Sequence, residues 1–143
     1  MSDFFMDEGS LELDDGWDDR TVTALTFPAG SQKPEASLSV TRDPLRPGLQ
    51  ISLAGYVDEQ LTRLAKSCQQ FRLIERQETT IGDLPAELVE FVWKTPDGFL
   101  MHQIQAVLIL TGKVMVLTGT AQSDKYAGFS DIFQQMIMSF RPR

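Results

Sequence analysis

The segment Leu100–Leu110, with the sequence LMHQIQAVLIL, is apolar on both of its alternating positions and determines the fold that we expect. One alternation contains Met101, Gln103, Gln105, Val107 and Ile109, and the other contains Leu100, His102, Ile104, Ala106, Leu108 and Leu110. The next apolar segment, Lys113–Ala121, repeats this pattern. Successive side chains point to opposite faces of a strand, so the pattern predicts a sheet that is apolar on both faces.

Segments on either side of this strand predict an antiparallel sheet. Alternating or β-branched runs indicate strands at 10–14, 20–27, 36–42, 71–80, 86–94, 99–110 and 113–121. Asp15-Gly16 predicts a turn, and the short connections at Thr95–Gly98 and Thr111–Gly112 predict hairpins between the last three strands. Tight hairpins join antiparallel strands, so we expect an antiparallel sheet.

Two segments have the spacing of helices rather than strands. Between Ser52 and Gln69 the apolar residues Val57, Leu61 and Leu64 share one helical face, and Cys68 continues that face as a buried structural thiol. A final helix begins at Ser123 or Asp124, either of which can cap it. The element order βββ-α-ββββ-α predicts the α+β class, with two helices packed on one face of the sheet and residues 1–143 forming a single domain.

Composition and charge exclude several classes of protein. The 143 residues carry a net charge of −7, and residues 1–19 contain eight acidic residues and no Lys or Arg. The remainder is nearly neutral and has no basic stripe, which argues against nucleic-acid binding. The sequence contains no run of about 18 apolar residues, so we expect no stable membrane insertion. The N-terminus lacks the pattern of a signal peptide, and a single cysteine suits a reducing compartment, so we expect a cytoplasmic protein.

The sequence contains few groups that could perform chemistry. His102 is the only histidine, it lies within a predicted strand, and no H-x-x-x-H, C-x-x-C or phosphate-binding glycine loop is present. The acidic residues between Asp14 and Asp19 do not have the spacing of a calcium loop. We therefore expect no enzyme activity, no cofactor and no metal site.

The second apolar face of the sheet predicts a binding surface. If both helices cover one face, the other face meets either a second copy of the chain or a different hydrophobic ligand. Gln103 and Gln105 lie among the apolar residues of that face and could bond to polar atoms of a guest, although they could also be ordinary solvent-facing residues. Small residues at Ala24, Ser37 and Ser39 would let a guest approach closely, which favours a groove for apolar helices.

A set of sequence segments, spread in a fixed order along nearly the whole chain, resembles the DcrB-like family, and within it the Eag-type chaperones of type VI secretion effectors. The segments that carry the resemblance are DGWDDR (15–20), EASLSVTRD (35–43), YVDEQL (56–61), FRLIER (71–76) and PAELVEFVW (85–93). The resemblance implies a PsbP/Mog-like α+β fold and a homodimer with a concave apolar face. It also implies that the protein binds the N-terminal transmembrane segments of an effector in the cytoplasm and helps to load the effector onto the secretion spike.

The resemblance also assigns residues to the binding of the guest. Carried over position by position, the family's groove residues are Val22, Ala24, Ser39, Gln60, Met101, Gln103 and Gln105. Ala24 and Ser39 are smaller or more polar than the bulky aliphatic residues expected at those positions. The alternative function is a homodimeric structural or interaction module of the same family, in which the second copy covers the apolar face.

Overall fold

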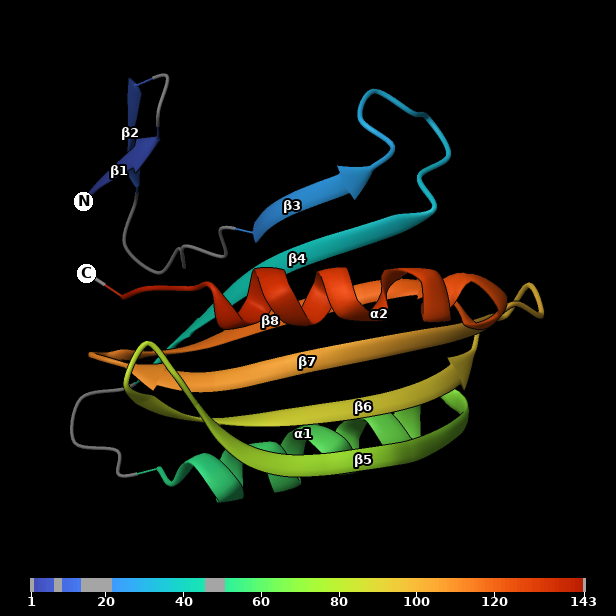
Figure 1. The fold of residues 1–143 in the computed structure, drawn as a ribbon. Helices are drawn as coiled ribbons and strands as arrows, with labels where there is room; N and C mark the ends of the chain where they lie inside the picture. The colour runs from blue at the N-terminus through green and yellow to red at the C-terminus, as the bar shows by residue number, and fades with distance from the viewer. Residues whose placement is uncertain (1, 7–8, 14–21, 46–50, 143) are drawn as a thin grey trace.

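The computed structural model describes residues 2–6, 9–13, 22–45 and 51–142. It contains two helices and eight strands in these ranges, arranged as shown in Figure 1. In chain order they are β1 (Ser2–Met6), β2 (Gly9–Leu13), β3 (Val22–Phe27), β4 (Ala36–Pro44), α1 (Leu53–Ser67), β5 (Gln69–Ile81), β6 (Leu84–Lys94), β7 (Leu100–Leu110), β8 (Lys113–Gln122) and α2 (Ser123–Met138).

Six strands form one antiparallel sheet in the order β3-β4-β8-β7-β6-β5, and β1 pairs only with β2. The central strands β7 and β8 are the two doubly apolar segments of the sequence. The predicted hairpins are present, and both require a glycine: Gly98 and Gly112 have φ angles of 94° and 77°. This left-handed region is unfavourable for residues with a Cβ. The antiparallel α+β architecture is therefore confirmed.

The two helices cover opposite faces of the sheet, so the predicted packing of both on one face is wrong. Figure 1 shows α2 in front of the sheet and α1 behind it. Along β7, Ile104 and Leu108 pack with α2, whereas Val107 packs with α1. Both alternations of the central strands are apolar because each is covered by a helix of the same chain. Helical spacing identifies the apolar side of a helix but not the sheet face that it covers.

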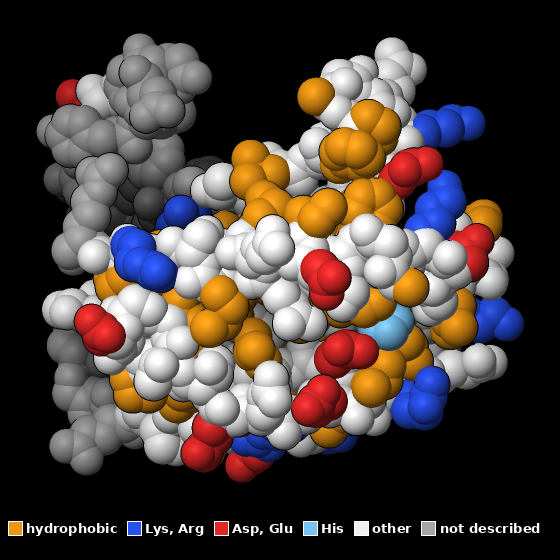
Figure 2. Space-filling model, in the orientation of Figure 1, with side chains coloured by type: hydrophobic (Ala, Val, Ile, Leu, Met, Phe, Trp, Pro, Cys, Tyr) orange, Lys and Arg blue, Asp and Glu red, His pale blue; other side chains and the backbone are white. Residues whose placement is uncertain are grey.

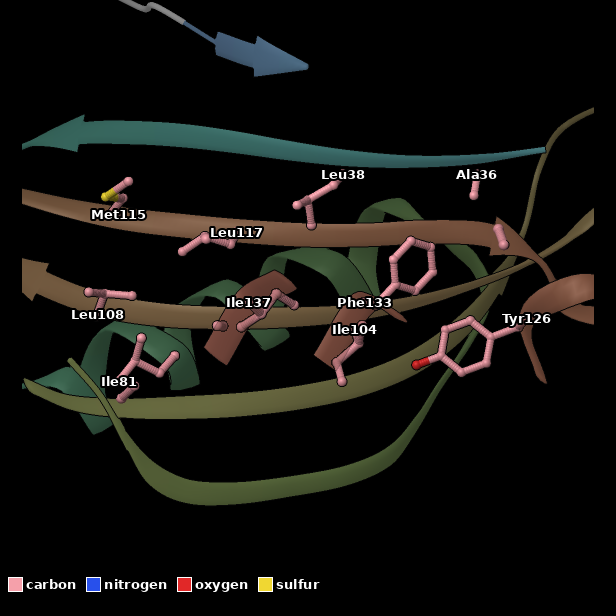
Figure 3. Packing of buried hydrophobic residues seen from close by; sticks show 13 residues of the cluster. Ala36, Leu38, Ile81, Ile104, Leu108, Met115, Leu117, Tyr126, Phe133 and Ile137 are labelled. Carbon is pink, nitrogen blue, oxygen red and sulfur yellow. The ribbon is translucent and has the colours of Figure 1, made fainter. Parts of the chain in front are cut away.

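On the α2 face, aromatic residues of the helix pack over the small and aliphatic residues of the strands. Figure 3 shows Phe133 and Ile137 of α2 directed toward Leu38, Leu117 and the neighbouring strand residues. Gly119 of β8 lies directly beneath Phe133, because a Cβ added there would be 2.6 Å from the Cγ atom of the ring. The absence of a side chain at position 119 therefore sets how closely α2 approaches the sheet.

On the α1 face, the helix packs on β5, β6 and β7, and neither of the two described helices covers the other half of the sheet. The fully buried residues Val57 and Phe91 form the centre of this core. Arg76 of β5 fixes the helix to the strands by bonding to Glu87 of β6 and to Asp58 of α1. Half of this face thus belongs to the core and half is accessible.

Several local predictions need correction. Ser52 caps α1 by accepting a bond from the backbone N–H of Gly55, but Gln122 stands at the cap position of α2 and makes no side-chain bond. Strand β8 runs directly into α2, so neither Ser123 nor Asp124 takes the capping role. Cys68 is half-buried just beyond the end of α1 and is not a fully buried residue of the helix. The predicted turn at Asp15-Gly16 lies outside the described residues.

Tyr56 and Tyr126 are buried where the helices pack on the sheet. Their phenol groups should therefore ionise at a higher pH in the folded protein than in the unfolded chain. Burial and the nearby Glu90 raise the pKa of Tyr126 to about 12, and burial together with Asp43 raises the pKa of Tyr56. A tyrosine in the unfolded chain ionises near its ordinary pKa of about 10. The stability linked to these groups should be complete below that value and should decrease as the pH rises toward the folded-state pKa. Tyrosinate absorbance should therefore develop at higher pH in the native protein than in denaturant, and coincident titrations would contradict the prediction.

Candidate binding surface

The uncovered half of the α1 face is formed by β3, β4 and β8. Directly opposed residues of antiparallel strands share a face, so the register identifies its members. We call this surface the open strip; it contains Val22, Ala24, Thr26, Ser37, Ser39, Thr41, Thr118 and Thr120. Its exposure rises toward the sheet edge, from the buried Thr118 to Val22, which is 57% exposed.

One cross-strand row connects the open strip to α1. Gln105 of β7 lies opposite Thr118, Thr118 lies opposite Ser39, and Ser39 lies opposite Ala24 at the sheet edge. Gln105 is only 8% exposed, and its Oε1 accepts a hydrogen bond of 2.7 Å from Nε2 of Gln60 on α1. Gln60 Oε1 is buried and has no partner among the described residues. A buried acceptor without a partner is costly, so this end of the row has an unused bonding capacity.

The neighbouring row is held by a second amide. Gln103 Oε1 accepts a bond of 2.7 Å from the indole Nε1 of Trp93, and Gln103 Nε2 donates a bond of 2.9 Å to Oγ1 of Thr120. The side chain therefore links β6, β7 and β8 across the boundary between the covered and open halves of the face. These bonds fix its orientation, which makes Gln103 a positioning residue for the open strip.

The structure places all seven predicted site residues on the α1 face. Ala24, Ser39, Gln105 and Gln60 share one row, Val22 and Gln103 belong to adjacent rows, and Met101 lies farther along β7 opposite Gln122. Sequence reasoning missed Thr118 and Thr120, which complete the rows. Both residues follow Val116 in an alternating strand, by two and by four positions, so they share its face. This spacing was the signal that could have identified them.

The expectation that this open face is apolar is wrong. Val107, Val114 and Val116, which gave the face its apolar pattern, are covered in the α1 core. The open strip instead presents hydroxyl groups and small side chains, with Val22 and Ala24 at its outer edge. The pattern identified the correct alternation, but the helix covers its most apolar part.

Exposed apolar surface lies on the opposite side of β3. Leu25 and Phe27 are 51% and 55% exposed, and with Phe129, Ile132 and Met136 of α2 they line a pocket of about 200 Å³. Figure 2 shows hydrophobic side chains gathered where β3 rises above α2. Edge strand β3 therefore exposes apolar side chains on both of its faces, which is uncommon for the edge of a monomeric sheet.

The remaining candidate groups lie away from the open strip. His102 is on the α2 face, where its ring stacks on Tyr126 at a centroid distance of 3.5 Å and its Nε2 is 2.9 Å from Oε2 of Glu90. Within the described ranges, no cluster of three or more His, Cys, Asp or Glu side chains could hold a metal ion. None of the described helices has both the length and the hydropathy needed to cross a bilayer.

Comparison with known proteins identifies the family of this chain. The sequence model of the DcrB family matches residues 8–139, which is most of the chain. The chain belongs to the DcrB family. A relative of similar length, named Effector EagT6, from Pseudomonas aeruginosa, is 25% identical over 143 residues, with 100% of this chain and 97% of the relative covered. The predicted resemblance to the DcrB-like family and to its Eag-type members is confirmed.

Solved structures extend the likeness of this DcrB-family chain to the fold predicted from the sequence. A Pseudomonas aeruginosa protein of unknown function has a TM-score of 0.81 at 24% identity, covering 100% of this chain and 97% of that protein. The PsbP protein of Synechocystis has a TM-score of 0.61 at 14% identity, covering 85% and 82%. LpqN of Mycobacterium tuberculosis, described as involved in cell envelope biogenesis, has a TM-score of 0.58 at 16% identity, covering 86% and 84%. The PsbP-like α+β fold is confirmed.

Proposed function

We propose that this DcrB-family protein is a cytoplasmic chaperone of a type VI secretion effector, and that the open strip binds the effector's N-terminal transmembrane segments. The full-length similarity to the relative named Effector EagT6 supports an effector-associated role. In this role the protein shields apolar helices from water and helps to load the effector onto the secretion spike. Binding is sufficient for the role, which requires no catalytic step, cofactor or metal ion.

The chemistry of the open strip supports a helical apolar guest. Helices inside membranes pack through small residues, which permit close approach, and through Ser, Thr and Gln side chains, which bond across the interface. The open strip provides Ala24, Ser39 and Thr118 along one row and a buried amide pair at its end. It thus offers an apolar helix the contacts that a neighbouring membrane helix would offer.

The row that ends at Gln60 is the observation that carries this proposal. Gln60 Oε1 has no partner in the described part of the chain, although it lies beside the open strip. Because this acceptor is buried in the unbound protein, the Gln60 side chain must turn toward the strip before a hydroxyl or amide donor of the guest can bond to it. Val22 and Ala24, at the other end, provide the apolar contact.

Ala24→Glu should abolish the complex with the effector segment while the fold persists. The variant places a carboxylate on the open strip, where an apolar guest would have to bury it unpaired. The matched control, Thr23→Glu, adds the same charge one residue earlier on the opposite face of β3. The full chain is co-expressed with the N-terminal region of the effector encoded beside its gene, and the soluble complex is quantified by size-exclusion chromatography.

We expect the complex to form with the unmodified chain and with Thr23→Glu, and to be lost by at least tenfold with Ala24→Glu. Equal complex formation by both variants would show that the guest binds elsewhere. An effector segment that stays insoluble beside the unmodified chain would contradict the chaperone role itself.

The exposed edge of β3 favours a second candidate, a homodimeric structural module. Val22, Leu25 and Phe27 are all more than half exposed and β3 carries no charged residue, so a second copy could cover the edge. The two candidates differ in what remains accessible. A dimer that leaves the open strip free to bind the effector segment supports the chaperone, and a dimer that seals the strip supports the structural module.

A further inference from the structure

A basic pocket lies at one end of the sheet, beside the segment that follows α2. It has a volume of about 880 Å³ and is lined by residues from β4, β6, β7, β8 and that segment. Three of these residues are cations, Arg42, Lys113 and Arg141, and none of the described lining residues is acidic. The chain as a whole has a net charge of −7, so this pocket concentrates positive charge in an acidic protein. The pocket therefore selects for an anionic ligand.

The three cations are available to such a ligand, because none of them forms an ion pair with another described residue. In the described part of the chain, Arg42 donates hydrogen bonds only from Nη1, to Oγ1 of Thr23 and to the carbonyl of Val40. Arg141 also uses only Nη1, which donates to two backbone carbonyls at the end of α2. Each guanidinium group thus keeps Nε and Nη2 as donors for a carboxylate or a phosphate.

The segment that carries Arg141 is held against the sheet before any ligand binds. Gly82, in the turn between β5 and β6, packs against this segment, because an added Cβ would be 2.5 Å from Cδ of Pro142 and 3.1 Å from the carbonyl oxygen of Phe140. The two bonds from Nη1 of Arg141, both 2.9 Å long, hold its guanidinium group near the end of the helix. A preformed site of this kind binds an anion with less loss of conformational entropy than a set of mobile side chains.

The rest of the pocket wall is largely apolar. Leu84, Leu110, Met115 and Phe140 line it, and each of them also belongs to the core beneath α2 or packs against that core. A ligand that carried only charge would leave this apolar surface exposed to water. The wall therefore fits an anion that has an apolar chain, and the volume is typical of a small-molecule site, for which roughly 300–1,000 Å³ is usual.

The sheet topology favours a small amphiphile over an extended peptide. The pocket strands β4, β8, β7 and β6 are consecutive in the sheet, and each is paired with a strand on both sides. Their backbone N–H and C=O groups are therefore used within the sheet, so a peptide cannot bind here as an added strand. Recognition at this pocket rests on side chains alone.

We propose that the basic pocket binds a single-chain amphipathic anion, with its carboxylate or phosphate group on the three cations and its alkyl chain on the apolar wall. The cations are half-buried or exposed, so salt weakens the binding. The pocket lies outside the open strip, and the inference does not depend on the proposed function.

Methionine methyl groups make the binding measurable by NMR of the full-length protein labelled with [methyl-¹³C]methionine. Met115 lines the basic pocket, Met136 lines the apolar pocket between β3 and α2, and Met101 lies on the α1 face. Replacement of each by Leu assigns its signal. The ligands are decanoate and decyl phosphate, each below the concentration at which it forms micelles, and the controls are decanol and acetate.

Two triple variants test the role of the cations. The site variant is Arg42→Gln/Lys113→Gln/Arg141→Gln, and the matched control is Lys33→Gln/Lys66→Gln/Lys94→Gln, so that the net charge changes equally. Unchanged positions of the Met101 and Met136 signals show that each variant is folded.

We expect decanoate, decyl phosphate or both to shift the Met115 signal saturably in the unmodified chain and in the control, and to bind at least tenfold more weakly to the site variant. The amphiphile that binds identifies the headgroup as a carboxylate, a phosphate or either. Decanol and acetate should bind at least tenfold more weakly, because each lacks one half of the ligand.

A Met115 signal that neither amphiphile moves would overturn the proposal, as would equal binding by the site variant or binding of decanol as tight as that of the anions. Movement of the Met136 or Met101 signal without Met115 would place the amphiphile on another surface and would also overturn it. A short peptide of alternating glutamate and phenylalanine that moves Met115 where neither amphiphile does would assign the pocket to a peptide instead.

Discussion

Arg76→Met should destabilise the protein by about 3 kcal/mol, the lower end of the range for breaking a buried ion pair. Arg76 Nε donates to Glu87 Oε1 at 2.6 Å, and Nη2 donates to the other oxygen at 3.3 Å. The Glu87 side chain is only 4% exposed, so the variant leaves a carboxylate in the sheet without its cation. Hydrogen bonds to Glu87 and then to Asp58 also raise the pKa of the guanidinium, as expected for a cation held by two carboxylates.

The same interaction predicts a series of graded effects. Asp58 is 66% exposed on α1, so Asp58→Asn should cost less than about 1 kcal/mol, as for other surface pairs. The double variant Arg76→Met/Glu87→Leu removes both buried charges and should recover most of the stability lost by Arg76→Met alone. Arg72→Met, at an exposed position of the same strand, is the control. Urea unfolding measures all four, and a double variant as unstable as the single one would show that the loss comes from packing.

This ion pair also affects the candidate site, because Arg76 fixes α1 in place. Its Nη1 bonds to Asp58 and its Nη2 bonds to the carbonyl of Ala54, both on the helix that carries Gln60. A helix that shifts by part of a turn would move Gln60 away from Gln105. Arg76→Met should therefore also weaken binding of the effector segment, whereas Asp58→Asn should leave it nearly intact.

Most of the fold was predictable because the strands have strong local patterns. The segment 99–110 was assigned nearly to its observed limits, Leu100–Leu110, because its apolar run is bounded by turn residues that break pairing. The helix predicted between Ser52 and Gln69 was found at Leu53–Ser67. Strand β1 was missed because its five residues, Ser2–Met6, show no alternation of polar and apolar side chains.

The position of the helices was not predictable from the same patterns, although the doubly apolar strand contained a clue. A strand that is apolar on both faces, in a chain with two amphipathic helices, is satisfied if each helix covers one face. The assignment of both helices to one face created the surplus apolar surface that the structure does not show on the open strip. The site residues were still placed on a common face, because alternation along β7 assigns Met101, Gln103 and Gln105 to one side whichever helix covers it.

Gly119→Ala should destabilise the protein by about 1–3 kcal/mol, the usual cost of overpacking a core. An added Cβ would lie 2.6–2.9 Å from three atoms of the Phe133 ring, which is itself buried beneath α2. The ring cannot retreat without lifting the helix, because Phe133 also packs beside Tyr126 and Phe129. Thermal unfolding should detect the loss as a lower melting temperature.

Two further variants separate the steric cause from a general effect of removing glycine. Gly128→Ala, in the exposed part of α2, has open space around the added methyl group and should stabilise the helix by about 0.5–1 kcal/mol. Phe133→Leu removes the ring that the methyl group added at position 119 would strike, so in the double variant with Gly119→Ala the two costs should be less than additive. Strictly additive costs would mean that the close approach of β8 and α2 is not what requires glycine at position 119. Coupling would show that the contact between Gly119 and Phe133 sets the position of α2 on the sheet.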